Sequence, residues 1–302
     1  MTSTDTRSIV SPKHSPVRSD NRTRPALWAR SLTWVLLVAA VIYFVVPVLW
    51  LFIASTKTAG DLYTTPGFSF AEFALWDNLE ALFGYRSGIF WRWMLNSGIY
   101  SVLGSLLVTL ICAMCGYAIA IYRFRGRRVL MSALLASLLI PATVTAQPVY
   151  LLLVQLGLNN TMIGVLLPSL VYPFGVMLSY IATLSAVPTE IIEAARIDGA
   201  GEFRTFFTIA VPLLRTGLTT VLLFSFIASW NSFLLPLLVL DDSTLYPVTV
   251  GLVDWSRQSS SVAQLGTLTI VGSFVSVLPL IAVFVALQRY WRSGLAAGGV
   301  KF

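Results

Sequence analysis

The sequence predicts an all-α integral membrane protein with six transmembrane helices. The first observation behind this is hydrophobicity: 57% of the 302 residues are hydrophobic, only 11% are charged, and the mean hydropathy is +0.81. The second is the length of the uncharged apolar runs, because about 20 such residues cross a bilayer as a helix. The third is that ten-residue segments of strand-type alternation, which a membrane β-barrel requires, do not occur in the sequence.

The N-terminal region divides into a polar tail and a first span. Residues 1–28 are rich in Ser, Thr, Pro and Arg and predict a disordered tail. The apolar run over 31–55 is too long for a signal-peptide core and lacks a clear cleavage site, so we expect an uncleaved first span. A membrane domain is then expected over 29–302, with its core at about 91–290.

Gaps between charged residues place the other five spans. The second is expected at about 93–122. The third and fourth share the uncharged stretch 129–189, which divides at 156–161, where Gly, Asn and Thr signal a turn. The fifth is expected at about 216–240 and the sixth at about 264–288.

The basic residues predict the orientation of these spans. With the tail inside, 16 of the 20 Lys and Arg residues fall on the inner side, as expected for cytoplasmic segments of membrane proteins. Both termini are therefore expected in the cytoplasm, together with the connection between spans four and five. The net charge of +7 has the same explanation, so we expect membrane lipid and not nucleic acid as a partner.

The connection between spans four and five, residues 188–214, carries four acids, two arginines and two glycines in an otherwise apolar region. A helix is expected over 190–198, with an acid in its first turn and a glycine after its end. Two adjacent alanines give this helix a side that a partner can approach closely. We expect either a rigid peg for a pocket on a cytosolic partner or an ordinary interfacial loop. A second short helix is expected to follow it at the membrane interface. The residues expected to make the partner contact are Glu193, Ala194, Ala195, Asp198 and Gly199.

These residues also carry a resemblance. Glu193, Ala194 and Ala195 are followed by Gly199 and, after nine further residues, by the segment Ile209–Pro212. The pattern resembles the EAA loop of ABC-importer permeases, with Val211 in place of the family's leucine.

Two further stretches narrow the resemblance. Residues 229–240 read SWNSFLLPLLVL, and the chain ends at 294–302 with GLAAGGVKF. Both resemble the second permease subunit of carbohydrate importers of the maltose and multiple-sugar group. The resemblance covers about residues 30–302.

The resemblance implies the partners of the chain. Such a subunit pairs with a second, homologous permease in a bacterial or archaeal cell membrane, and an ATPase dimer receives the EAA helices. An external solute-binding protein delivers the sugar. ATP and Mg are expected on the ATPase, and the chain itself has no GxxxxGK[ST] phosphate loop. We therefore expect a non-catalytic subunit without a cofactor or metal of its own.

The expected spans contain no Asp, Glu, Lys, Arg or His. Ionisable residues within a membrane usually mark ion or proton paths, so their absence favours a neutral, hydroxyl-rich substrate. The candidates for the substrate path are polar or aromatic residues inside the spans: Asn231, Trp230, Ser232, Gln147, Tyr172 and Ser179.

Two other classes of protein stay open at this point. A stand-alone secondary transporter for a neutral polar solute is one, since sodium-coupled carriers also use neutral oxygens. A membrane enzyme is the other, and it would need a nucleophile and a base within a span. Cys112 and Cys115 form a CxxC inside an apolar span, where we expect ordinary helix residues and no metal or redox site.

Overall fold

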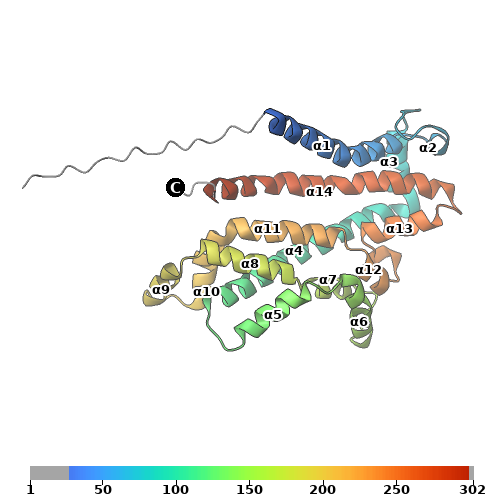
Figure 1. Ribbon diagram of the computed structural model, residues 1–302. Helices are drawn as coiled ribbons and strands as arrows, with labels where there is room; N and C mark the ends of the chain where they lie inside the picture. The colour runs from blue at the N-terminus through green and yellow to red at the C-terminus, as the bar shows by residue number, and fades with distance from the viewer. Residues whose placement is uncertain (1–26, 299–302) are drawn as a thin grey trace, which may run out of the picture. The chain divides into compact units, whose positions relative to one another are not determined.

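The computed structural model describes residues 27–298 (Figure 1). Residues 1–26, most of the expected tail, and 299–302, the end of the chain, lie outside the described residues. The described residues form helices and connecting turns, with no strand among them. The chain divides into two units, Met1–Pro47 and Val48–Phe302. The described part of the first unit is one helical segment, which begins at Leu27, inside the expected tail.

The helices follow one another along the chain as α1 (Leu27–Ser55), α2 (Asp61–Thr64), α3 (Leu75–Gly84), α4 (Ile89–Ile121), α5 (Arg127–Ser137), α6 (Ala142–Gln155), α7 (Met162–Ser169), α8 (Pro173–Ala186), α9 (Thr189–Ile197), α10 (Glu202–Thr205), α11 (Val211–Trp230), α12 (Leu234–Val239), α13 (Val248–Gln258) and α14 (Ala263–Gly298). Three shorter turns accompany them: the 3₁₀ turns η1 (Tyr85–Ser87) and η3 (Ser243–Leu245), and the π-turn η2 (Phe206–Ala210).

Four helical segments are long and apolar enough to cross a membrane: Ser31–Ser55, Ile89–Ile121, Glu202–Trp230 and Ala263–Gln288. Two further pairs, α5 with α6 and α7 with α8, meet the same test only when each pair is taken together, and they bend by 105° and 42°. The described residues therefore provide four spans, or up to six if each bent pair is one span. The turn expected at 156–161 is confirmed, because α6 ends at Gln155 and α7 begins at Met162.

The third and fourth expected spans are each divided into two helices. Pro141 precedes α6 and Pro173 opens α8, and each follows a break in the helix. The proline ring disfavours helical backbone angles in the residue before it, and Tyr172 accordingly has φ −130° and ψ 79°. Each proline thus ends one helix and begins the next at a new angle.

The fifth span was placed too late in the sequence. A single helical run extends from Glu202 through the π-turn to Trp230, and residues 234–239 form the separate helix α12. The expected second short helix is therefore the first part of this run. A π-turn suits this position because Pro212, which follows it, lacks an N–H and would press on the carbonyl four residues earlier in a regular α-helix.

Helix α4 is central to the packing of the second unit. It runs beside α8 and α11, and α11 also packs against α14 (Figure 1). Its buried face is lined by small side chains, which let helix backbones approach closely in a membrane. These include Ser97, Ser101, Ser105, Cys112 and Gly116.

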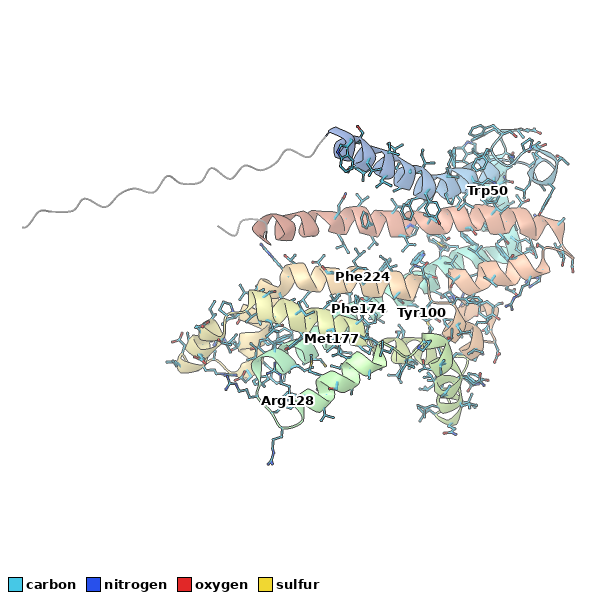
Figure 2. All side chains as sticks on the ribbon, viewed as in Figure 1. Trp50, Tyr100, Arg128, Phe174, Met177 and Phe224 are labelled. Atoms are coloured by element: carbon cyan, nitrogen blue, oxygen red, sulfur yellow. The ribbon has the colours of Figure 1, made fainter. Side chains whose placement is uncertain are left out.

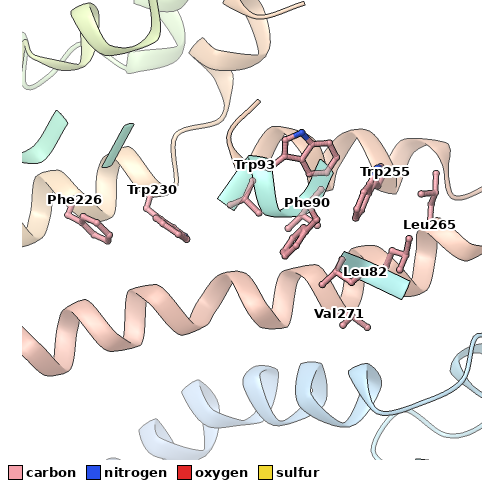
Figure 3. Close-up of a cluster of buried hydrophobic side chains, with 11 residues drawn as sticks. Leu82, Phe90, Trp93, Phe226, Trp230, Trp255, Leu265 and Val271 are labelled. Carbon is pink, nitrogen blue, oxygen red and sulfur yellow. The ribbon is translucent and has the colours of Figure 1, made fainter. Parts of the chain in front are cut away.

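Aromatic side chains fill the core at the α13 end of α4 (Figure 3). The rings of Trp93 and Trp255 lie 4.7 Å apart, and Phe90 stacks on Trp255 at 6.3 Å. Such pairs contribute about 0.5–1.5 kcal/mol each beyond the burial of their area. Trp230, at the end of α11, stacks on Phe226 in the same cluster (Figure 3).

Donor side chains of α4 hold the loop before α13. Trp93 Nε1 donates to the carbonyl of Ser243 at 2.7 Å, and Asn96 Nδ2 donates to the carbonyls of Thr244 and Tyr246 at 2.8 and 3.0 Å. A further donor in this row is Tyr100, whose hydroxyl reaches the carbonyl of Leu245 at 3.0 Å. Every acceptor in this row is a main-chain carbonyl.

Candidate functional site

Helix α9 is a short, amphipathic element between α8 and the run that begins at Glu202. Glu190 lies in its first turn and Arg196 in its last, so both charges complement the helix dipole. Gly199 has φ +77° and ends the helix in a left-handed turn. The N–H of Gly199 donates to the carbonyl of Arg196 at 3.0 Å, and that of Ala200 to Ala195 at 2.9 Å. This pair of bonds is a Schellman motif, and it fixes the direction in which the chain leaves α9.

The two alanines of the predicted contact face point in different directions. Ala194 is exposed, as are Glu193, Asp198 and Gly199, whereas Ala195 is only 7% exposed and packs inward. The exposed face is completed by Ile197, which is 86% exposed. Sequence reasoning missed Ile197, although it lies three residues after Ala194 and therefore on the same side of a helix.

The buried face of α9 joins a core shared with α4 and α11. Ile192 is 1% exposed and belongs to a cluster with Tyr117 of α4 and with Phe206, Ala210 and Leu214 of the long run. The rings of Tyr117 and Phe206 lie 5.2 Å apart. Helix α9 is therefore packed directly against two long helices.

A polar network crosses the turn after α9 and reaches the end of α4. Arg196 Nε and an Nη atom donate to the two carboxylate oxygens of Glu202 at 2.8 and 3.3 Å, and the hydroxyl of Tyr122 donates to the same carboxylate. The Arg196 guanidinium also lies 5.7 Å from the centre of the Tyr122 ring. Sequence reasoning missed this network, because Tyr122 and Glu202 are 80 residues apart.

The interactions within the network raise the pKa values of Arg196 and Tyr122, so both side chains stay protonated. The hydrogen bond that Arg196 donates to the Glu202 carboxylate raises the pKa of the Arg196 guanidinium above its usual value. Partial burial, followed by the Glu202 bond, raises the pKa of the Tyr122 phenol to about 12. Tyr122 therefore remains a donor throughout the physiological pH range. Since the Arg196–Glu202 pair is exposed, we expect it to contribute only about 0.2–1 kcal/mol, so its main effect is on orientation.

We expect Glu202→Gln to loosen α9 without unfolding the protein. Loss of the ion pair should raise amide hydrogen exchange in residues 190–197 by up to about fivefold, which corresponds to the free energy of an exposed pair. Hydrogen-exchange mass spectrometry checks this, with exchange in the core of α4 unchanged. Glu193→Gln is the matched control, because Glu193 loses the same charge but makes no bond to another described residue. Equal exchange in the two variants would contradict the role given to the network.

A second candidate site is a cavity of about 200 Å³ between α4, α7, α11 and α12. Two of the predicted substrate-path residues, Tyr172 and Ser232, line it. Tyr100 and Ser229 also line it, and the Ser229 hydroxyl donates to the carbonyl of Tyr100 at 3.1 Å. The residues around the cavity include hydroxyls and aromatic rings but no Asp, Glu, Lys, Arg or His.

The other four predicted path residues lie elsewhere. Trp230 is 4% exposed in the aromatic core, and Ser179 is fully buried against α4, where its hydroxyl has no hydrogen-bond partner among the described residues. Gln147 is exposed on α6. Asn231 is exposed, and its amide donates to the carbonyl of Ile227 in its own helix at 2.9 Å. Of the six predicted path residues, the cavity therefore brings together only Tyr172 and Ser232. Tyr100 and Ser229 also line it but were not predicted.

The sequence matches the family of binding-protein-dependent transport system inner membrane components over residues 105–296. The chain belongs to this permease family. The matched region includes α9, the Arg196–Glu202 pair and most of the cavity lining. The resemblance read from the EAA pattern is thereby confirmed.

Relatives of this permease are similar along nearly their whole length. The arabinooligosaccharides transport system permease protein AraQ of Halalkalibacterium halodurans is 33% identical over 89% of this chain and 97% of its own. The diacetylchitobiose uptake system permease protein NgcG of Streptomyces coelicolor is 30% identical over 93% of this chain and 90% of its own.

A solved structure supports the fold of the permease. It is the crystal structure of a bacterial ABC transporter involved in the import of the acidic polysaccharide alginate. The TM-score is 0.76 at 21% sequence identity, over 92% of this chain and 100% of the matched one. This similarity concerns the arrangement of helices.

Proposed function

We propose that this permease is a membrane subunit of an ATP-driven ABC importer that moves a carbohydrate delivered by an external solute-binding protein. The observation that carries the proposal is the family membership of the chain together with relatives named for oligosaccharide uptake. The cavity lining contains no Asp, Glu, Lys, Arg or His, which agrees with a neutral, hydroxyl-rich substrate. The subunit itself is non-catalytic, and ATP and Mg bind to the partner ATPase.

In this proposal the chain crosses the membrane six times, with each bent helix pair as one span. Both termini and α9 lie in the cytoplasm of a bacterial or archaeal cell. A second, homologous permease completes the path, and an ATPase dimer receives α9 from each permease. The basic residues on the expected inner side support this orientation.

Helix α9 is the coupling element of the proposed mechanism. Its exposed face offers Glu193, Ala194 and Ile197 to the ATPase, with Asp198 and Gly199 at its end. When ATP closes the ATPase dimer, α9 moves with it. The Ile192 cluster and the Arg196–Glu202 pair then pass the displacement to α4 and the long run Glu202–Trp230, which reorients the path.

Transport by the purified components tests the proposal. The permease pair, its ATPase and its binding protein in proteoliposomes should take up sugar only when ATP is present on the ATPase side. The permease alone should show no uptake. Uptake by the single chain would instead support a stand-alone secondary transporter for a neutral polar solute.

Cysteine cross-linking tests the contact face of α9. We expect Ala194→Cys to form a cross-link to the co-purified ATPase, because position 194 is exposed. Ala195→Cys is the matched control: it is the adjacent residue on the same helix, it is 7% exposed, and it should give little or no product. SDS gels under non-reducing conditions measure both. Equal yields at the two positions would contradict the proposed face.

A further inference from the structure

The connection between α4 and α5 concentrates positive charge in a very short segment. Four arginines occur in the six residues 123–128: Arg123, Arg125, Arg127 and Arg128. Arg123, Arg125 and Arg128 are exposed, and Arg127 is half-buried. Figure 2 shows the Arg128 side chain extended away from the ribbon.

Only one of these arginines is engaged within the described chain. An Nη atom of Arg127 donates to the hydroxyl of Tyr180 at 3.4 Å, and its guanidinium lies 5.9 Å from the centre of that ring. The other three make no hydrogen bond or ion pair to a described residue. The carboxylate that bonds the preceding Tyr122 belongs to Glu202, which is already paired with Arg196. Among the described residues, the guanidiniums of Arg123, Arg125 and Arg128 therefore have unused donors and no paired acid.

The surroundings of the arginines are apolar. Phe124, Val129 and Leu130 are large and exposed, and Val129 is 73% exposed. The segment directly follows α4, an apolar helix of 33 residues. The arginines therefore lie where a membrane-spanning helix ends, with apolar side chains beside them.

The N-terminus of α5 adds to the positive potential. Gly126, with φ +91°, turns the chain into α5, and no side chain caps the first N–H groups of this 11-residue helix. An uncapped N-terminus carries a partial positive charge and favours an anion. Two independent features, the free guanidiniums and the open helix end, thus favour the same kind of ligand.

We propose that this segment binds the headgroup of an anionic phospholipid. The planar guanidinium donates two parallel hydrogen bonds to phosphate oxygens, which makes arginine well suited to a lipid phosphate. A lipid fits better than a free phosphate because Phe124, Val129 and Leu130 offer apolar contacts to its acyl chains. Arg127, held by Tyr180, connects the site to α8. A bound lipid holds the turn between α4 and α5 at the membrane surface.

Titration of the full-length protein in detergent with defined lipids tests this inference. Native mass spectrometry should detect binding of phosphatidylglycerol in preference to phosphatidylcholine. Arg125→Gln with Arg128→Gln should weaken the apparent affinity for phosphatidylglycerol about tenfold, because each basic residue near a membrane surface contributes substantially to anionic lipid binding. Arg92→Gln with Arg257→Gln is the matched control, since these arginines are also exposed but belong to the expected outer side, and it should change the affinity less than about twofold.

Each result decides for or against the site. The variant Arg125→Lys with Arg128→Lys keeps the charge but loses the paired guanidinium donors, so its affinity should lie between those of the wild type and the glutamine pair. Equal binding of both lipids, or equal loss in the glutamine pair and its control, would overturn the proposal. Complete displacement of the lipid by inorganic phosphate at physiological ionic strength would also overturn it, in favour of a free-phosphate site.

Discussion

Gly116→Leu is expected to remove most of the folded protein from membrane extracts. Gly116 lies on α4 where α8 crosses it, and a Cβ atom there would lie 2.6 Å from both Ser179 Cβ and Tyr180 N, and 2.7 Å from the Ser179 carbonyl carbon. Two of these three atoms are main chain, so the contact cannot be relieved by a rotamer change. The helices must separate, which costs at least the roughly 1–3 kcal/mol of an overpacked core.

Gly98→Leu is the matched control for Gly116→Leu. Gly98 lies on the same helix, and a Cβ atom there would meet nothing within 4 Å. Yield and thermal unfolding by fluorescence-detected size-exclusion chromatography compare the two variants. We expect near wild-type behaviour for Gly98→Leu, and similar yields for both variants would contradict the close approach of α4 and α8.

Gly199→Val is expected to abolish uptake by the assembled importer while leaving the protein in the membrane. A side chain at Gly199 would meet no atom within 4 Å, so the cost comes from its φ of +77°. For a non-glycine residue this conformation costs roughly 1–2 kcal/mol, and more for a β-branched one. Unwinding the turn relieves the strain, but it breaks the bond from Ala200 N to Ala195 O and releases the end of α9.

Gly201→Val separates this effect from side-chain size. Gly201 has φ −69° and ψ 157°, which valine adopts readily, and its added Cβ also meets nothing within 4 Å. Sugar uptake and ATPase activity of the reconstituted assembly are the measurements. We expect ATP hydrolysis without uptake for Gly199→Val and coupled transport for Gly201→Val. Wild-type uptake in Gly199→Val would remove the turn from the coupling mechanism.

The long helices could be predicted from the sequence because a run of about 20 apolar residues is the length that a helix needs to cross a membrane. The expected spans at 31–55, 93–122 and 264–288 fall on α1, α4 and α14. The bends inside the third and fourth spans could not be read from hydropathy, which is insensitive to helix breaks. Pro141 and Pro173 were the available signals, but a proline is compatible with either a kinked or a broken helix.

The α9 site could be predicted in part, because some of its features depend only on neighbouring residues. The glycine after α9 and its left-handed turn follow from local chemistry. Which of the two alanines faces outward does not, because the packing of Ile192 against α4 and the long run decides it. The cavity escaped prediction because its lining comes from four separate helices. Asn231 was expected on the path, but its amide donates to the carbonyl of Ile227 in its own helix.

The hydrogen bonds from α4 to the loop before α13 affect which positions of this protein can change in sequence. Trp93, Asn96 and Tyr100 donate hydrogen bonds only to main-chain oxygens of residues 243–246. These bonds therefore do not depend on which side chains the loop carries. Substitutions at Ser243 and Thr244 can therefore accumulate while the backbone path of the loop is held, whereas Leu245 and Tyr246 also pack against neighbouring hydrophobic clusters.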